Sequence, residues 1–295
     1  MKNKKNVRCL HEGNILMEYH LYREALKKLK EAYSLGEMIA AYKIGKIYMQ
    51  SDLQNYEKAY YWLQLGAEAG ERNALYYLSK FYEYDLLGKY DLNKAYQCLC
   101  RAAEQKEVRS ILHLSFWYRT GFYVKRNHIK SWSLLSEAVE LGSAEACYQM
   151  GQIYEEGNEH ISPNLIESAA YYHQAARQKH SYALYQLGRW YWEGIFYRRN
   201  ASQAIRYLEE SSNLGCSEAQ YFLSSLCGMD IYPYGYRKYT LLTAAAKQNH
   251  VQAMYDLGCM FLFGNSFIQE DKETAIYWFR KAAEHGHEKA KNYLK

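Results

Sequence analysis

The sequence predicts an all-α protein in which antiparallel helix pairs stack into an α-solenoid, and three observations carry this prediction. A short motif recurs along the whole chain with a period of about 36 residues. A second segment with helical periodicity follows each copy of the motif. Proline, which costs a helix interior about 3 kcal/mol, occurs only twice among the 295 residues. A repeat array made of helices satisfies all three observations.

The first helix of each repeat is predicted from a motif of a small residue, an aromatic residue, an aliphatic residue and then Gly or Ser. The copies at residues 146–151, 183–188 and 253–258 are clear, and the copy at residues 110–115 is the most degraded. Seven copies follow one another at intervals of 34 to 37 residues, a regularity that chance does not produce. The Gly or Ser positions are Gly45, Ser79, Ser115, Gly151, Gly188, Ser224 and Gly258.

The second helix of each repeat is predicted from a segment that ends in small residues, often followed by a glycine. Ala282, Ala283 and Gly286 form this end in the last repeat. Small residues let two helices approach closely, and a glycine just beyond a helix adopts the left-handed conformation that ends it. Three polar residues that stand just before second helices are predicted to cap them, and these are Asn127, Asn200 and Asp271.

The repeat around Ser224 departs most from the pattern. Gly228 and Pro233 interrupt its middle, and Lys238 and Leu241 replace the usual alanine and aromatic residue. Two interpretations stay open, a kink or insertion loop that receives a partner and neutral drift in a tolerant repeat.

The motif resembles the Sel1-like repeat, a relative of the tetratricopeptide repeat, over nearly the whole chain. The resemblance implies a right-handed α-solenoid of antiparallel helix pairs. It implies a capping helix pair at residues 1–37, seven repeats at residues 38–287, and the start of a capping helix at residues 288–295. In the last repeat the consensus places are occupied by Ala253, Leu257, Gly258, Gly264, Ala275, Trp278, Lys281, Ala282, Ala283, Glu284, Gly286 and His287.

The first helices are predicted to have a buried face and an open face, because an α-helix turns about 100° per residue. Residues four before and four after the aliphatic position lie close to it and should be core. The tyrosine two before it, and the residues two and five after it, lie on the other side. The resemblance implies that this side lines a concave groove.

Groove positions that the repeat does not require are candidates for partner binding, because Trp, Tyr and Arg dominate binding hot spots. The tyrosines have an alternative role in packing between neighbouring repeats. The candidates are Lys46, Lys80, Phe116, Arg119, Tyr185, Arg189 and Trp192.

Turns between the two helices of a repeat carry aromatic and basic residues, and stacked repeats would place these turns on one edge. Such a basic loop ridge could contact an acidic protein surface or a nucleic acid. Solvated loops with incidental charge are the alternative, because the net charge is only +5. The ridge residues are Lys125, Arg126, Arg198, Arg199, Arg237 and Lys238.

The sequence offers no catalytic apparatus. It has no GxxxxGK[ST] phosphate loop, no HExxH and no CxxC pair, and neither a cofactor nor a metal is predicted. His180, His250 and His287 are interpreted as structural because the family often has histidine there. The seven irregularly spaced cysteines are interpreted as free thiols in a reducing compartment. One cysteine-rich branch of the family is associated with penicillin binding, but this chain lacks its regular cysteine pairs and any Ser-x-x-Lys motif.

The predicted function is therefore a non-catalytic adaptor that holds a protein or peptide partner in its concave groove. RNA binding through the ridge, or a hydrolase of the cysteine-rich type, are the alternatives, and no small-molecule substrate is expected. No apolar stretch reaches the 18 residues of a membrane span, and His11, Glu12 and Asn14 stand where a signal-peptide core would be. A cytoplasmic bacterial protein is expected, with secretion as an effector by a signal-independent route as the alternative. The oligomeric state stays open.

Overall fold

The computed structural model describes residues 2–50, 52–229, 237–264 and 268–294, and the regular elements within these ranges are helices. The chain divides into two compact units, Met1–Ser143 and Ala144–Lys295. The first unit holds α1 (Lys2–Glu18), α2 (Tyr22–Ser34), α3 (Ile39–Gln50), α4 (Tyr56–Glu68), α5 (Arg72–Glu83), α6 (Leu92–Glu104), α7 (Val108–Thr120) and α8 (His128–Glu140). The second unit holds α9 (Ala144–Glu156), α10 (Leu165–Arg177), α11 (Ser181–Glu193), α12 (Ala201–Asn213), α13 (Ser217–Leu226), α14 (Arg237–Lys247), α15 (Val251–Phe263), α16 (Lys272–Glu284), α17 (Glu288–Lys291) and the 3₁₀ turn Asn292–Leu294.

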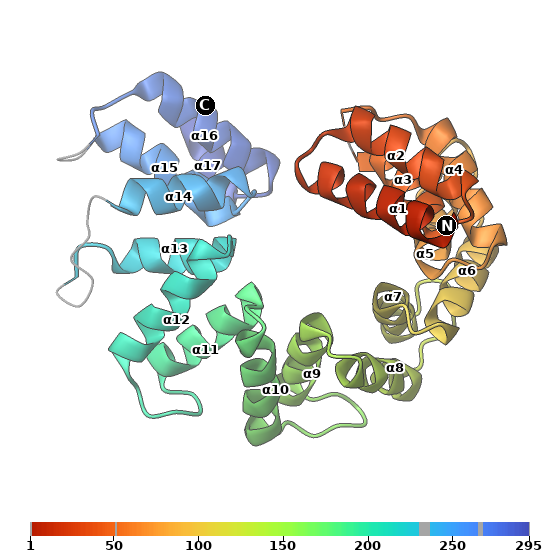
Figure 1. Ribbon diagram of the computed structural model, residues 1–295. Helices are drawn as coiled ribbons and strands as arrows, with labels where there is room; N and C mark the ends of the chain where they lie inside the picture. The colour runs from red at the N-terminus through yellow and green to blue at the C-terminus, as the bar shows by residue number, and fades with distance from the viewer. Residues whose placement is uncertain (1, 51, 230–236, 265–267, 295) are drawn as a thin grey trace. The chain divides into compact units, whose positions relative to one another are not determined.

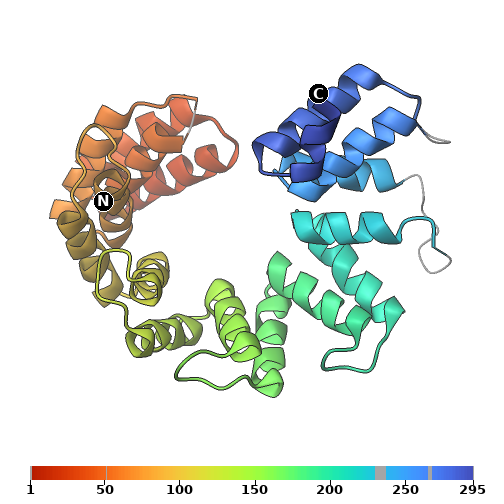
Figure 2. The ribbon, with the colours of Figure 1, turned by 180° about the vertical axis from the view of Figure 1, so that it is seen from behind.

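Helices pack as consecutive pairs within each unit, and each pair then packs on the next one (Figure 1). The view from behind shows the same order of pairs along each unit (Figure 2). Short turns join helices that lie side by side, so the two members of a pair run antiparallel. The predicted all-α solenoid of helix pairs is confirmed.

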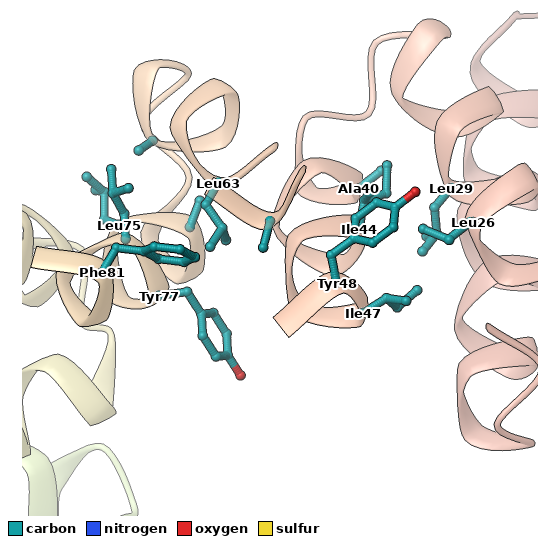
Figure 3. Close-up of a cluster of buried hydrophobic side chains, with 14 of the residues drawn as sticks. Leu26, Leu29, Ala40, Ile44, Ile47, Tyr48, Leu63, Leu75, Tyr77 and Phe81 are labelled. Atoms are coloured by element: carbon teal, nitrogen blue, oxygen red, sulfur yellow. The ribbon is translucent and has the colours of Figure 1, made fainter. Parts of the chain in front are cut away.

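The core of the first unit runs between successive helices, as one cluster of apolar side chains from α1 to α6 and a second cluster, around Leu99 and Trp117, that joins α6 to α7. Figure 3 shows Leu26 and Leu29 of α2 on the side of Ile44 and Ile47 of α3. All four are buried, and the same cluster continues to Phe81 of α5. A thin stack of helices thereby buries apolar surface without a single central core.

The Gly or Ser position of the motif is where the two helices of a repeat come closest. A β-carbon built on Gly258 would lie 2.6 Å from the Phe279 ring. Ser115 instead uses its hydroxyl, which bonds the Ser131 hydroxyl at 2.9 Å and the Ser131 carbonyl at 3.0 Å. The small residue is therefore required by close helix packing, as the motif predicts.

The predicted caps of the second helices are confirmed. The side-chain oxygen of Asn127 accepts from the Lys130 amide at 2.9 Å, and Asn200 accepts from the Gln203 amide at 3.0 Å. Asp271 caps α16 through the Thr274 amide at 3.0 Å. Asn55, Asp91 and Asn164 cap α4, α6 and α10 in the same way.

The middle of the divergent repeat is only partly described. Pro233 lies outside the described residues, and Gly228 has a left-handed φ of 90° just after α13. Arg237 and Lys238 were expected in the turn, but they form the first turn of α14. The reason is register, because α14 begins at the same place in its repeat as α8 and α12 do in theirs.

Candidate partner-binding face

The first helices of each unit present an open face, defined here as the first-helix face, formed by the positions two before and two and five after the aliphatic residue. Its tyrosines contact the following repeat. Tyr42 stacks on Tyr77 at a ring distance of 6.3 Å, and Tyr148 stacks on His180 at 4.8 Å. The interpretation that the tyrosine ladder packs neighbouring repeats together is confirmed.

The three histidines at the repeat ends cap the next first helix. His180 accepts from the Ala183 amide through Nδ1 at 3.3 Å, which leaves its Nε2 to donate to Glu145 at 3.0 Å. His250 caps α15 through the Ala253 amide and stacks on Tyr221 at 4.5 Å. His287 repeats this geometry on α17, so the structural interpretation of all three is confirmed. In the first unit Glu71 and Glu107 cap the corresponding helices α5 and α7.

A buried polar cluster joins α5 to α7 on the first-helix face of the first unit. Lys80 donates to Nδ1 of His113 at 2.8 Å and lies 3.2 Å from Glu83. The Nε2 of His113 in turn donates to Glu83 at 2.9 Å. Only 16% of the Lys80 side chain and 8% of the Glu83 side chain are exposed. Burial lowers the pKa of Lys80, although the Glu83 charge opposes this shift.

Arg109 ties the same face together one turn closer to the start of α7. Its guanidinium donates to Glu107 at 2.7 Å, to Asn73 at 2.8 Å and to the Tyr77 hydroxyl at 3.1 Å. It also lies 4.4 Å from the centre of the Tyr76 ring. Four groups that precede α7 in the chain, three of them on α5, thus hold this one cation in a single position.

Phe116, Arg119 and Lys46 are the accessible predicted residues of this face. Phe116 is 45% exposed, and the Arg119 guanidinium lies 5.8 Å from its ring. Lys46 lines a pocket of about 190 Å³ together with Met17 and Tyr22. Lys46, Lys80, Phe116 and Arg119 therefore occupy the open side of three successive first helices, α3, α5 and α7.

In the second unit, Arg189 is part of the packing between repeats. It donates to Glu155 at 2.6 Å, and Glu155 also accepts from the Tyr172 hydroxyl at 2.6 Å and from the Trp190 indole at 3.0 Å. Burial and then this hydrogen bond raise the pKa of Tyr172. Thirty per cent of the Arg189 side chain stays exposed. Truncating Arg189 would leave Glu155 with one donor fewer, so a variant there tests stability and binding at once.

Trp192 and Tyr185 pack on the next repeat. Trp192 meets Phe222 edge to face at 6.0 Å, and Tyr185 meets the same ring at 6.4 Å. The Arg199 guanidinium lies over the Trp192 ring, 5.3 Å from its centre. Arg199 of the predicted ridge and Trp192 of the predicted groove are thus contacts of one another.

Each unit holds part of the predicted basic loop ridge. Lys125 and Arg126 belong to the first unit, and Arg126 donates to the His128 ring at 2.6 Å. Arg198 and Arg199 are exposed in the second unit, where Arg237 pairs with Glu209 at 2.9 Å. Lys238 lines an open pocket with Asp256 and Cys259. Three of the six cations therefore already contact groups of this chain.

Sequence reasoning missed two residues that organise the first-helix face, Arg109 and His113, and it placed Glu155 on this face without foreseeing its contacts. Arg109 stands five residues before Leu114, and at about 100° per residue that spacing places it on the open side. The same spacing could have identified it. The pairing of Glu155 with Arg189 depends on how one repeat rotates against the next, which no spacing within a repeat predicts.

All seven cysteines are free thiols, and four of them are buried. Within the described ranges no group of three or more His, Cys, Asp or Glu side chains could hold a metal ion. No helix in the same ranges is both long enough and apolar enough to cross a membrane.

The sequence pattern of the Sel1 repeat matches residues 39–71, 72–107, 108–143, 144–180, 181–216 and 251–287. The chain belongs to the Sel1 repeat family. Six of the seven expected repeats are matched, and the segment left out, residues 217–250, is the divergent repeat around Ser224. The boundary between the two compact units, after Ser143, coincides with the boundary between the matched repeats 108–143 and 144–180.

Solved Sel1 structures share this fold. A Sel1 repeat protein from Oxalobacter formigenes aligns with a TM-score of 0.73 at 22% identity, covering 81% of this chain and 99% of that one. A protective antigen of uropathogenic Escherichia coli aligns with a TM-score of 0.63 at 24% identity, covering 92% of this chain and 59% of that one.

Curated fungal relatives are regulators of chitin synthase. Chitin synthase regulatory factor 3 of Schizosaccharomyces pombe is 25% identical over 232 residues, which are 74% of this chain and 24% of the relative. The chitin synthase regulator SKT5 of Saccharomyces cerevisiae is 25% identical over 214 residues, 68% of this chain and 31% of the relative. The chain thus spans about a quarter to a third of the length of these relatives.

Proposed function

We propose that this Sel1 repeat protein is a non-catalytic scaffold whose first-helix face binds a segment of a partner protein. One observation carries the proposal: hydrogen bonds and ring contacts between repeats hold the side chains of this face in place. Arg109 and the cluster of Lys80, Glu83 and His113 are examples. A surface ordered before binding loses little side-chain entropy when a partner docks, which favours recognition.

The relatives support the same function. The fungal proteins are regulators of an enzyme by their names, and a regulatory role without catalysis suits a repeat scaffold. The cytoplasmic location expected from the sequence belongs to this proposal. The expected bacterial origin stays a prediction, because the curated relatives are fungal.

Site-specific photo-crosslinking tests the proposal. A photoreactive phenylalanine analogue replaces Phe116 on the first-helix face, and in a control chain it replaces Tyr61 on the second helix α4. Both positions are exposed, Phe116 at 45% and Tyr61 at 58%, so each probe can reach a neighbour. The variants are irradiated in lysate of the cells that make the protein, in parallel with and without nuclease.

We expect a discrete protein adduct from position 116 that position 61 does not give. Adducts of equal yield from both positions, or none from position 116, would contradict the assignment of the face. An adduct that nuclease removes would assign the face to nucleic acid instead.

A further inference from the structure

The first helices of the first unit are strongly basic. Across α3, α5 and α7 the only carboxylate within the helices is Glu83, against six cations. Counted from the aliphatic position of each motif at about 100° per residue, all seven charges lie on the open side. The six cations are Lys43, Lys46, Arg72, Lys80, Arg109 and Arg119.

The second unit shows the reverse distribution. Its first helices α9, α11, α13 and α15 contain one cation, Arg189, against six carboxylates. The whole chain has a net charge of only +5, so the basic character is concentrated on particular helices. The six carboxylates are Glu145, Glu155, Glu156, Glu193, Glu218 and Asp256.

The one carboxylate of the basic face is already neutralised. His113 donates to Glu83, and Lys80 lies 3.2 Å from it. Burial acts to raise the pKa of Glu83, but the His113 hydrogen bond and the Lys80 charge together lower it, so Glu83 is ionised and paired. Arg109 is likewise paired, with Glu107 at 2.7 Å. The positive field of this face therefore comes from the cations that have no carboxylate partner.

Lys80 and Arg109 pair with carboxylates, and Arg72 donates to the Gln105 carbonyl at 2.9 Å. The other three cations, Lys43, Lys46 and Arg119, have neither kind of partner among the described residues. Lys43 lies 5.3 Å from the Tyr42 ring, and Arg119 lies 5.8 Å from the Phe116 ring. Burial and then the charge of Lys46 lower the pKa of Lys43. Two lysines that repel one another and are partly desolvated favour the arrival of an anion.

An apolar anchor stands beside these charges. Phe116 occupies the same place in α7 that Lys80 and Lys46 occupy in α5 and α3, two residues after the aliphatic position. Its ring is 45% exposed, whereas Trp117 beside it is fully buried. A partner segment can therefore bury one apolar side chain on Phe116 while its charges meet the cations on either side.

We propose that the basic face, meaning Lys43, Lys46, Lys80, Arg109, Phe116 and Arg119, binds an acidic peptide segment that carries at least one apolar side chain. This inference rests on the proposed scaffold function and specifies the chemistry of the partner. Aspartate or glutamate side chains pair with Lys43, Lys46 and Arg119, and the apolar side chain packs on Phe116. Arg109 and Lys80 are held by their own contacts and set the shape of the surface.

A nucleic acid fits this face less well. Affinity for a phosphate backbone comes mainly from the number of cations that neutralise phosphates, and three unpaired cations provide few such contacts.

Selection from a random dodecapeptide library displayed on phage tests the inference with the full-length protein. The reversal variant is Lys46→Glu with Arg119→Glu. The matched control is Lys27→Glu with Lys30→Glu on the second helix α2, where both lysines are exposed and have no ion pair among the described residues. The two variants change the net charge equally, and circular dichroism with a thermal melt checks that both stay folded.

Wild type and control should enrich peptides rich in Asp and Glu with one Phe, Leu or Trp. A labelled peptide of the enriched sequence should bind the reversal variant about tenfold more weakly or worse. Its affinity for wild type should also fall between 0.1 M and 1 M salt, as the screening length shrinks from about 10 Å to about 3 Å.

Several outcomes would overturn the inference. Enrichment of neutral or basic peptides, no enrichment at all, or equal binding of the acidic peptide by the reversal variant would each do so. Tighter binding of a labelled single-stranded RNA than of the peptide, lost in the reversal variant, would assign the face to nucleic acid. The crosslink from position 116 separates the two proposals, because it requires a protein partner but no acidic one.

Discussion

Among single residues, the histidine caps have the clearest chemical consequence. A histidine can accept a backbone amide bond through Nδ1 only while that nitrogen carries no proton. His250 meets this condition on α15, and burial lowers its pKa, although Glu218 and Asp256 act in the opposite direction. The first unit caps the same position with Glu71 and Glu107 instead of histidine.

The second unit should therefore lose stability when the pH falls below about 6.5, the ordinary pKa of histidine. Above that pH the neutral cap is intact in the folded state. Below it the unfolded chain takes up the proton first, and stability falls until the pH reaches the lowered folded pKa. His250→Asn retains an amide oxygen as a cap but does not titrate. The free energy of unfolding, measured by urea titration at pH 7.5 and pH 5, should drop further for wild type than for this variant.

His250→Ala provides the control for the cap itself. It should lose about 1 kcal/mol at pH 7.5, because α15 then has an unsatisfied amide. If the free energy of unfolding depends equally on pH in all three proteins, His250 has the same pKa in the folded and unfolded states.

Among the elements, the distance between the two helices of a pair is limited by a close contact at the Gly or Ser position. Gly258 of α15 lies under the Phe279 ring of α16, where a β-carbon would be 2.6 Å from the ring. Gly→Ala within a helix normally stabilises it by about 0.5–1 kcal/mol. The sign of the effect at this position therefore reports on packing between the helices.

Gly258→Ala should destabilise the protein by about 1–3 kcal/mol, because the added methyl group forces the two helices apart. Combining it with Phe279→Leu should cost less than the sum of the two single changes, since the smaller side chain makes room for the methyl group. Chemical denaturation of the four proteins of this cycle measures the coupling. Additive costs would mean that the ring and the glycine do not limit one another.

For the whole molecule, contacts between neighbouring pairs predominate, so stability should behave as a chain of local terms. The Gly258→Ala variant should therefore exchange its backbone amide hydrogens faster than wild type, most in α15 and α16 and least in α1 to α6. Peptide-resolved mass spectrometry measures these rates. An equal rise in every peptide would instead indicate one cooperative unit across all 295 residues.

The sequence sufficed for features that most repeats share, and it failed for contacts that one particular pair of repeats makes. The motif period, the caps Asn127, Asn200 and Asp271, and the packing role of the tyrosines follow from composition and helical spacing. Arg189 was expected to contact a partner, but its pairing with Glu155 appears only when two repeats are placed against each other. Such contacts depend on the rotation between repeats, which a one-dimensional pattern does not contain.

The two fully buried tryptophans provide a consequence for spectroscopy. Trp117 lies in the first unit and Trp190 in the second, and both side chains are 0% exposed. The Trp190 indole donates to Glu155, whereas the Trp117 indole nitrogen has no hydrogen-bond partner among the described residues. Indoles in such different surroundings emit at different wavelengths, and each emission shifts when water reaches the ring. A chain in which Trp117 or Trp190 is the only one of the six tryptophans kept would therefore carry an intrinsic fluorophore that reports the opening of a single unit, with no dye attached.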